Sequence, residues 1–396
     1  MAIELSNLTF TDQDDIVPSP GVEEIIINTG VTNTLAGNDV INGGTTSIST
    51  WKSPTAAYNS AVYNNDTLNT ADGDDIITGI GSRMADYNIN GHGIHNELGT
   101  IETGNGDDII TGRSGPTEEY SSGGLGIYNQ RGIIETGDGN DIITGISPGG
   151  GIQNTDGTIN TSDGNDTITG NSNPDGDYTG ATDGIQISRG TIDTGKGNDV
   201  ITGNGFYGIL SFDSTINTGN GNDIIIGNST ETRLGGLGIL NTGLMDTGDG
   251  NDTITGTNPG LDPLSWGIRN ESDITTGDGK DIITGTGRIL NNGTINTGNG
   301  ADSIISEEGF NGFGSVFLEN GKDYLKGFGS GNFNGGNGQD TLELTSGSYT
   351  VGISSAEVNF TKDGIIMNTS EFEKLQAGNT TYNFNSLING QTIFVA

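Results

Sequence analysis

The chain has 396 residues and a formal net charge of -37, which comes from 51 Asp and Glu against 14 Lys and Arg. So acidic a chain is repelled by nucleic acid and by anionic lipid surfaces, which leaves cations as its natural partners. Because it contains no Cys, disulfide bonds and thiolate metal sites are excluded, and oxygen atoms are the metal ligands it can offer.

Residues 1–35 form the first predicted segment. Two runs within it, 4–10 and 24–27, are strand-like in composition, and we expect them to cap the region that follows or to pair with another molecule. The segment has no basic stretch followed by an apolar one, so we predict export without an N-terminal signal peptide. No apolar run approaches the roughly 20 residues that a membrane helix needs, so we expect no membrane insertion.

An internal repeat dominates residues 36–306. The phrase T-G-D-G-N-D-I-I-T-G, or a close variant, recurs along this region and continues beyond it, each time around one Asp. A second phrase, Gly-Ile-x-Asn, recurs before many copies. The twelve Asp at the centre of the motif are Asp39, Asp75, Asp108, Asp141, Asp166, Asp199, Asp223, Asp252, Asp281, Asp302, Asp323 and Asp340.

Apolar residues accompany the copies at fixed spacing. Ile127, Ile134 and Ile143 are seven and then nine residues apart, and other copies keep these intervals. The triplet predicts three short strands per coil, each with one Ile directed inward, because a stack of coils buries apolar surface that a single coil cannot. We therefore predict an all-β fold, a parallel β-solenoid of about twelve stacked coils. The alternative, an acidic Gly-rich linker without fixed structure, would not require constant spacing.

The distance between successive motif Asp varies from 17 to 36 residues. Because the spacing within a triplet is constant, this variation falls after the Asp-containing strand, where we expect external loops rich in turn-forming residues. Any specificity for a partner would reside in these loops. The predicted loops are 53–60, 113–124, 171–180 and 257–265.

Residues 307–396 change in character. The motif spacing shortens at the start of this region, and after residue 344 alternating and aromatic segments replace the motif. We predict a few further turns of the repeat followed by a β-rich C-terminal cap.

The best copy of the motif lies at 335–343 and reads G-G-N-G-Q-D-T-L-E. It fits every position of the nonapeptide G-G-x-G-x-D-x-U-x, in which U is a large aliphatic residue. The chain thus resembles the RTX family, whose proteins carry hemolysin-type calcium-binding repeats. The resemblance implies a β-roll or β-helix in which the Gly-rich half forms a tight turn, the Asp supplies carboxylate oxygen, and calcium lies between the turns of neighbouring coils.

The end of the chain, 334–396, is similar to the C-terminal tails of RTX proteins from cyanobacteria, which type I secretion systems recognise. This similarity implies an extracellular or cell-surface protein. A calcium-dependent chain would stay unfolded in the cytosol, where calcium is scarce, and would fold when it meets calcium outside.

A separate physical argument also leads to calcium. Stacked coils would align the motif carboxylates about 4.8 Å apart, where like charges repel by roughly 1 kcal/mol in water and by more inside a protein. A file of Ca²⁺ ions would remove this repulsion, since calcium accepts about six to eight oxygen ligands, carbonyls included. We therefore take Asp39 to Asp340 of the motif set as candidate ligands, with a turn residue that bonds its own backbone as the alternative for each. Ala71, Ser162 and Glu319 replace the second Gly of the nonapeptide, which favours one calcium file over two.

The sequence offers little for catalysis. There is no Cys and no G-x-S-x-G motif, and His92 and His95 are the only His. We predict that the protein is not an enzyme and that both His lie at the edge of a coil.

We predict an extracellular, calcium-binding structural protein that assembles with copies of itself, through the open strand edges at its ends, into a fibre, sheath or surface layer. The alternative is a secreted monomeric adhesin that binds ice or polysaccharide. Ice binding would use the third motif position, which holds a mixture of Asp, Asn and Lys and is expected to stay hydrated. The expected partners are calcium ions, like subunits and cell-surface polysaccharide, without nucleic acid.

Overall fold

The computed structural model describes residues 2–19, 24–44, 60–81, 83–84, 89–115, 123–172, 182–230, 235–260, 265–354 and 357–396. The chain divides into two compact units, Met1–Thr218 (unit 1) and Gly219–Ala396 (unit 2). In the described residues the regular structure is β-strand, apart from two short 3-10 turns, η1 (Leu5–Asn7) and η3 (Phe384–Ser386).

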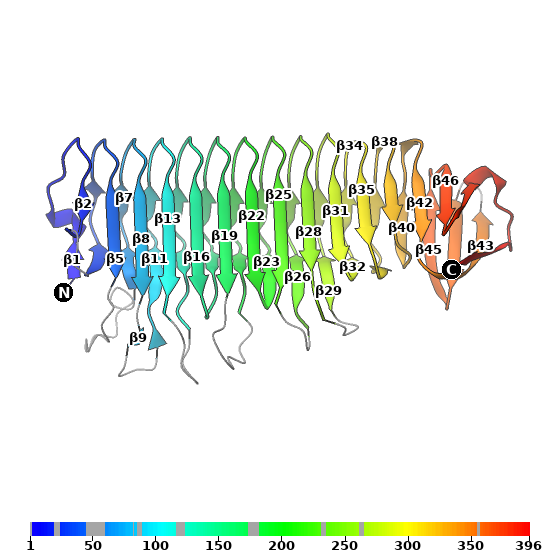
Figure 1. The fold of residues 1–396 in the computed structure, drawn as a ribbon, viewed down its shortest axis with the longest axis horizontal. Coiled ribbons are helices and arrows are strands. Elements are labelled where there is room, and N and C mark those ends of the chain that lie inside the picture. Colours follow the sequence, from blue (N-terminus) through cyan, green and yellow to red (C-terminus); the bar gives the residue numbers. More distant parts are fainter. Residues whose placement is uncertain are drawn as a thin grey trace. The chain divides into compact units, whose positions relative to one another are not determined.

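Unit 1 is built from three parallel sheets, and successive coils of the chain add one strand to each sheet (Figure 1). Sheet A contains β1 (Ala2–Glu4), β3 (Ile25–Asn28), β6 (Ser60–Asn64), β11 (His92–Glu97), β14 (Ile127–Gln130), β17 (Ile152–Thr155), β20 (Ile185–Ser188) and β23 (Tyr207–Phe212). Sheet B contains β2 (Ile16–Val17), β5 (Val40–Gly44), β8 (Ile76–Gly81), β13 (Ile109–Ser114), β16 (Ile142–Ser147), β19 (Thr167–Ser172) and β22 (Val200–Gly205). Sheet C contains β4 (Thr32–Asn33), β7 (Thr67–Asn69), β12 (Thr100–Glu102), β15 (Ile133–Glu135), β18 (Thr158–Asn160), β21 (Thr191–Asp193) and β24 (Thr215–Asn217). The short strands β9 (Arg83–Met84) and β10 (Ile89–Asn90) pair antiparallel outside these sheets.

Unit 2 contains strands of the same three kinds. Its sheet A strands are β26 (Leu237–Asn241), β29 (Trp266–Asn270), β32 (Arg288–Asn291) and β36 (Gly309–Asn311). Its sheet B strands are β25 (Ile224–Ser229), β28 (Thr253–Thr257), β31 (Ile282–Thr286), β35 (Ser303–Ser306), β39 (Tyr324–Lys326), β42 (Thr341–Leu344), β46 (Lys374–Ala377) and β47 (Thr380–Asn383). Its sheet C strands are β27 (Leu244–Asp246), β30 (Asp273–Thr275), β33 (Thr294–Asn296), β37 (Ser315–Phe317), β40 (Gly331–Asn334), β45 (Ile365–Ser370), β44 (Glu357–Lys362), β43 (Gly347–Ser354) and β48 (Thr392–Val395). A small parallel sheet is formed by β34 (Asn299–Gly300), β38 (Asn320–Gly321) and β41 (Asn337–Gly338).

The predicted apolar triplets form the core of the coils. Ile127, Ile134 and Ile143 lie in β14, β15 and β16, one in each sheet, and none of the three side chains is exposed. Each is paired in register with the Ile of the next coil, as Ile127 is with Ile152. Full burial of each aliphatic side chain contributes roughly 2 kcal/mol, so the stack supplies what one coil lacks. The prediction of a parallel β-solenoid is confirmed.

A row of buried Asn side chains lies near the ends of the sheet A strands. In unit 1 the Nδ2 atoms of four of these Asn each donate a hydrogen bond of 2.7–2.9 Å to the Oδ1 atom of the Asn one coil further on, and the fifth, Asn154, has Ile187 opposite it. Asn96 Nδ2 also donates to the carbonyl oxygens of Gly99 and Ile133, at 3.0 and 2.9 Å. Bonds to both flanking turns satisfy these polar groups inside the core. The row contains Asn28, Asn64, Asn96, Asn129 and Asn154 in unit 1, and Asn241, Asn270 and Asn291 in unit 2.

The N-terminal segment 1–35 contributes coil strands. β1 pairs in parallel with β3 in sheet A, and β2 pairs in parallel with β5 in sheet B. Of the strand-like run 4–10, only Glu4 lies in a strand, because the chain turns through η1 and buries Leu5. The run 24–27 matches β3 closely.

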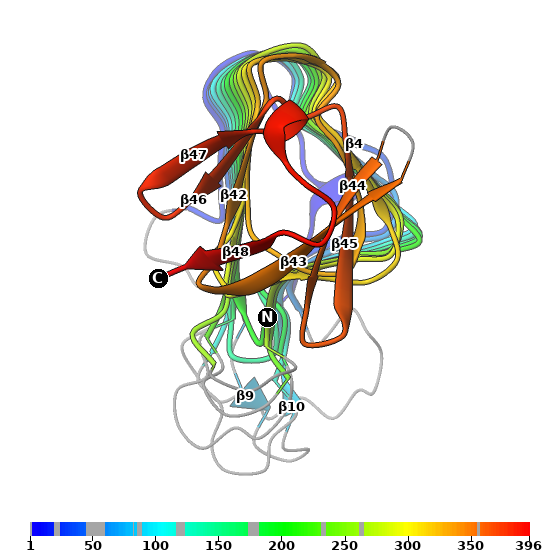
Figure 2. The ribbon, with the colours of Figure 1, turned by 90° about the vertical axis from the view of Figure 1, so that its right-hand side faces the viewer.

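The parallel order ends within unit 2. β43 pairs antiparallel with β44 and β48, β44 with β45, and β46 with β47 (Figure 2). Tyr349 and Phe360 are fully buried among these strands. The predicted external loops fall largely outside the described residues.

Candidate metal site: a buried carboxyl ladder

The Gly-rich half of each motif forms a tight turn between a sheet C strand and a sheet B strand. Gly137 has a left-handed backbone, with φ of 83°, and a Cβ atom placed on it would lie 1.9 Å from the carbonyl oxygen of Gly104 in the neighbouring coil. Ala71, Ser162 and Glu319 occupy the same position with φ of 64°, 62° and 62°. The departures from the nonapeptide therefore keep the turn, at a conformational cost of roughly 1 kcal/mol each.

The motif Asp side chains point into the turn and are buried. Asp108 is fully buried, and its Oδ1 atom accepts a hydrogen bond of 2.7 Å from the backbone N–H of Asp75, one coil before it. The N–H of Asp108 donates in turn to Asp141 Oδ1 at 2.8 Å. The same bond joins Asp39 to Asp75, Asp141 to Asp166 and Asp166 to Asp199 in unit 1, and Asp223, Asp252, Asp281, Asp302, Asp323 and Asp340 in succession in unit 2. We call this row the carboxyl ladder.

Each described carboxyl therefore bonds the backbone of its neighbour. The alternative considered for a single Asp was a bond to its own backbone, whereas Oδ1 bonds the backbone of the preceding coil. Residues far apart in sequence are thus joined along one edge of each unit.

Two further residues, which the sequence pattern did not single out, extend the ladder. The N–H of Asp15 donates to Asp39 Oδ1 at 2.8 Å in unit 1, and Glu373 Oε2 accepts the N–H of Asp340 at 2.7 Å in unit 2. Their signal in the sequence is an acid two residues before a buried aliphatic residue, Val17 and Leu375 respectively. Both lie in segments without the Gly-rich half of the motif.

The second carboxyl oxygen faces a different environment. At Asp281 it accepts a hydrogen bond of 2.9 Å from the hydroxyl of Thr276, and at Asp141 it accepts one from Thr136. At eight other positions Oδ2 is buried and accepts no hydrogen bond of normal geometry among the described residues: Asp39, Asp75, Asp108, Asp166, Asp252, Asp302, Asp323 and Asp340. At the first six of these, the hydroxyl of the Thr five residues earlier nevertheless lies near enough to lower the pKa of the carboxyl. A buried carboxylate oxygen without a well-formed hydrogen bond is costly, so these atoms mark places where a proton or a cation would bind.

Burial also raises the pKa of these carboxyl groups. The pKa of Asp108 rises from an ordinary value of 3.8 to about 8, chiefly through burial and in smaller part through the negative charges of Asp141 and Asp75, which outweigh the lowering by hydrogen bonds from Thr103 and from the N–H of Asp75. The pKa values of Asp166 and Asp281 rise to about 7 for the same first reason. Near neutral pH the ladder therefore needs a compensating positive charge, which protons or metal ions can supply.

The donor atoms fit calcium better than the other common metals. They are hard oxygens, eight of them buried, in turns whose Gly residues stack directly on the carbonyls of the neighbouring coil. Within the described ranges no three His, Cys, Asp or Glu side chains converge on one point. A cation would therefore take carboxylate oxygens from neighbouring coils and complete its shell with turn carbonyls.

The outer side of the turns carries exposed polar side chains. Asn105 Nδ2 donates to Asp72 Oδ1 at 2.8 Å, and Lys196 Nζ bonds Asp163 Oδ2 at 2.7 Å with both side chains largely exposed. This third motif position is the one that ice binding would use. Its mixture of charged and amide groups is solvated, as expected from the sequence.

The two His lie on sheet A and belong to an aromatic row. His95 is 4% exposed and stacks on Tyr128 at 4.8 Å between ring centroids. His92 Nδ1 accepts the backbone N–H of Leu125 at 3.0 Å. Burial lowers the pKa of His92 to about 3, helped by His95, so both rings are neutral at physiological pH.

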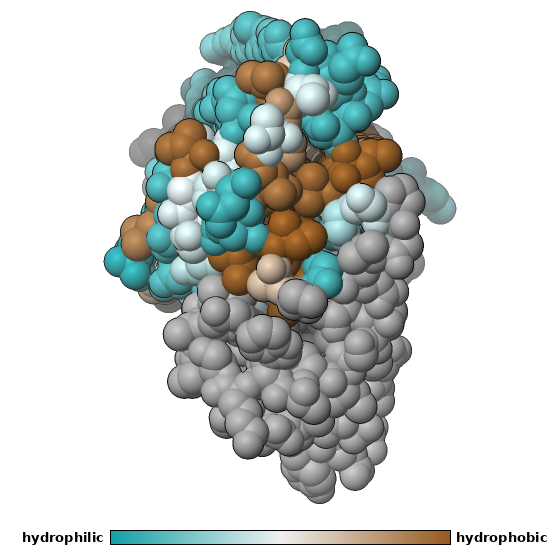
Figure 3. Space-filling view, turned by 90° about the vertical axis from the view of Figure 1, so that its left-hand side faces the viewer, coloured by the Kyte–Doolittle hydropathy of each residue, from teal (hydrophilic) through white to brown (hydrophobic). Residues whose placement is uncertain are grey.

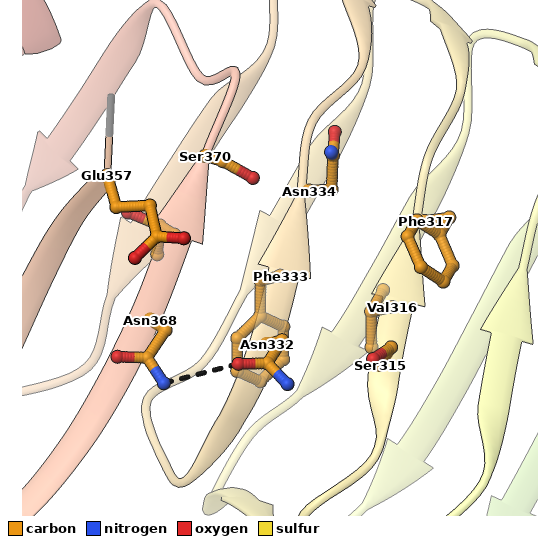
Figure 4. A pocket seen from close by; sticks show the side chains of 10 residues that line it. Ser315, Val316, Phe317, Asn332, Phe333, Asn334, Glu357, Asn368 and Ser370 are labelled. Atoms are coloured by element: carbon orange, nitrogen blue, oxygen red, sulfur yellow. Dashed lines mark hydrogen bonds between the residues drawn. The ribbon is translucent and has the colours of Figure 1, made fainter. Parts of the chain in front are cut away.

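A shallow pocket of about 140 Å³ lies beside β37, β40 and β45 of unit 2 (Figure 4). Asn368 Nδ2 donates to Asn332 Oδ1 at 3.2 Å, and Phe317 and Glu357 flank these amides. Glu357 is the only titratable residue in the lining, so the pocket offers hydrogen bonds for a small polar ligand and no acid–base pair.

No family model matches the chain, and no curated protein matches it. In the part of the chain that the structure describes, no helix is long and apolar enough to cross a membrane.

Proposed function

We propose that this chain is an extracellular, calcium-binding structural protein whose coils are joined by calcium along one edge and which assembles with copies of itself. The observation that carries the proposal is the carboxyl ladder. Its buried carboxylate oxygens, and their pKa values raised by burial, are features that a bound cation would stabilise.

The motif Asp, from Asp39 to Asp340, would hold the calcium together with carbonyls of the Gly-rich turns. Bound calcium would neutralise the carboxylates of adjacent coils and so favour the stacked state over the unfolded chain. Oδ1 of each ladder Asp accepts a hydrogen bond from the backbone N–H of the preceding coil. Oδ2 is therefore the oxygen that would bind the cation.

The N-terminal end of unit 1 supports assembly. β1, β2 and β4 each pair with a strand on one side only among the described residues. Figure 3 shows apolar side chains gathered at the centre of this end, and Val31 is 71% exposed. Open strand edges beside apolar surface are sites at which further chains add.

The test is refolding of the denatured, purified chain at pH 8 with millimolar calcium, with magnesium, or with chelator. Circular dichroism should report strand structure in calcium alone, and negative-stain electron microscopy should then show fibres or sheets. If the chain folds equally well in chelator, the proposed calcium role is wrong. If it folds in calcium but forms only discrete particles, the proposed assembly alone is wrong. Magnesium is the matched control because it prefers octahedral sites with several waters.

The pocket of Figure 4 favours a second candidate, an adhesin for saccharide. Amides, hydroxyls and the rings of Phe317 and Phe333 are groups that bind neutral sugars. Glycan binding by the folded chain that is lost in Asn368→Ala would support this function.

A further inference from the structure

The solvent side of sheet B in unit 1 is almost free of charge. In β5, β8, β13, β16, β19 and β22 the outward positions hold no acidic residue, and Arg113 is their one charged side chain. Ile80 and Ile142 are 48% and 41% exposed. We call this surface the β-branched face. Its outward residues are Val40, Asn42, Gly44, Ile76, Thr78, Ile80, Ile109, Thr111, Arg113, Ile142, Thr144, Ile146, Thr167, Thr169, Asn171, Val200, Thr202 and Asn204.

The absence of acidic side chains distinguishes this face from sheet C of the same unit. Glu102, Glu135 and Asp193 occupy outward positions of β12, β15 and β21. Unit 2 repeats the contrast: the outward positions of β25, β28, β31 and β35 are uncharged, while Asp246 and Asp273 lie on its sheet C. In unit 2 the acid-free stretch of sheet B ends before β42, which carries Glu343 at an outward position.

The face is also regular and rigid. Thr111, Thr144, Thr169 and Thr202 stand opposite one another in register, about one strand spacing of 4.8 Å apart. Their hydroxyls have no hydrogen-bond partner within the described part of the chain, and β-branched side chains have few rotamers. Ordering this face on contact therefore costs little conformational entropy.

The chemistry of the face limits which class of molecule can bind to it. It is flat, while small ligands need a concave site, and it lacks the basic residues that nucleic acid or anionic lipid would require. A second copy of this chain offers the same uncharged, regular surface. Because this face carries no acidic side chain, two copies of net charge -37 can approach through it with less repulsion than through sheet C.

We propose that two copies associate laterally, β-branched face to β-branched face, about a two-fold axis. The sheets would pack roughly 10 Å apart, as stacked sheets do. Strand spacing and residue rise give roughly 600 Å² for the six strands of unit 1. Two such faces would together bury about 1,200 Å², which is the lower end of the range for specific interfaces. The inference rests on the proposed function, for it names the lateral contact that would turn fibres into a sheath or layer.

The test exploits the lack of native Cys, since one introduced thiol is unique. Thr144→Cys places it on the β-branched face, and Thr191→Cys, a half-buried Thr on sheet C, is the matched control. With calcium, a bismaleimide reagent should link Thr144→Cys chains into dimers and leave Thr191→Cys chains largely unlinked. Equal yields from both variants would overturn the proposal.

A charge placed on the face gives an independent readout. Thr144→Lys should weaken dimerisation measured by analytical ultracentrifugation by about tenfold or more, because like charges would then meet across the axis. Thr191→Lys should leave it unchanged, and circular dichroism of both variants should match the parent. Unchanged dimerisation of Thr144→Lys would assign assembly to another surface and leave the proposed function intact. A chain that folds with calcium yet stays monomeric would overturn the lateral contact, as would Thr144-dependent binding to ice or crystalline polysaccharide. Folding without calcium would instead count against the proposed function.

Discussion

Asp108 and Asp75 are 33 residues apart in sequence, and the carboxyl of the first accepts the backbone N–H of the second at 2.7 Å. The bond occupies one oxygen of Asp108 and leaves the other buried without a hydrogen bond of normal geometry. One side chain thus has two separable roles, a neutral one as hydrogen-bond acceptor and a charged one as candidate calcium ligand.

Substitution of Asp108 by Asn separates these roles, because an amide oxygen can still accept the N–H of Asp75. We expect Asp108→Asn to raise the stability of the chain in chelator, since it removes a buried carboxylate, and to lower it in calcium, since it removes a ligand. Thermal unfolding in both conditions is the measurement. Asp107→Asn, at the exposed neighbouring position, should change neither by more than about 0.5 kcal/mol. The same sign of effect in both conditions would contradict the calcium role.

Stability in chelator should depend on pH. The folded pKa of Asp108, about 8, lies above its ordinary value of 3.8, so between these pH values the folded chain binds more protons than the unfolded chain. Stability is therefore highest near pH 4 and falls as pH rises toward about 8. Urea unfolding at pH 5, 6.5 and 8 should show this fall, and calcium should reduce it. Stability that rises over this range without calcium would show that the carboxyls are not buried as described.

The buried Asn row is expected to be a main source of stability. Asn96→Ala removes donors to Asn129, Gly99 and Ile133 and leaves their buried acceptors without a partner. We expect a loss of about 2–4 kcal/mol in the free energy of unfolding. Asn105→Ala is the control, because that amide is exposed. Similar losses in the free energy of unfolding for both variants would mean that water can replace the hydrogen bonds of the row.

The two Gly of the turn should differ in tolerance. The Gly137 position holds Ala71 and Ser162 in other coils, whereas the position of Gly139 holds Gly in every motif copy. A Cβ atom would lie 1.9 Å from a backbone carbonyl oxygen at Gly137 and 1.8 Å from one at Gly139, but φ is 155° at Gly139, far from the left-handed values of 64° and 62° that Ala71 and Ser162 adopt at the Gly137 position. We expect Gly139→Ala to destabilise the chain by at least about 2 kcal/mol and Gly137→Ala by about 1 kcal/mol. Chemical denaturation of both variants measures the order, and a reversed order would show that the coils separate to admit the methyl group.

The repeat made the fold predictable. Ile127, Ile134 and Ile143 reveal three inward positions because their spacing stays constant while the loops vary, and the structure places one in each sheet. The carboxyl ladder was harder to predict from the sequence. Spacing aligns the motif Asp, but whether Oδ1 of Asp108 meets a cation or the N–H of Asp75 depends on the depth of the side chain in the turn, which the sequence does not encode locally. Asp15 and Glu373 were missed because their role comes from stacking on a neighbour, without the Gly-rich signature.

The carboxyl ladder also has a direction. Every described bond runs from the N–H of one coil to the carboxyl of the next coil along the chain, and in unit 2 the last acceptor is Glu373. Removing coils from the N-terminal side would leave a carboxyl without its donor, whereas removing the segment that contains Glu373 would leave the N–H of Asp340 without its acceptor. Within each unit the ladder is therefore polar, because the backbone of each coil is completed by a side chain of the coil that follows it.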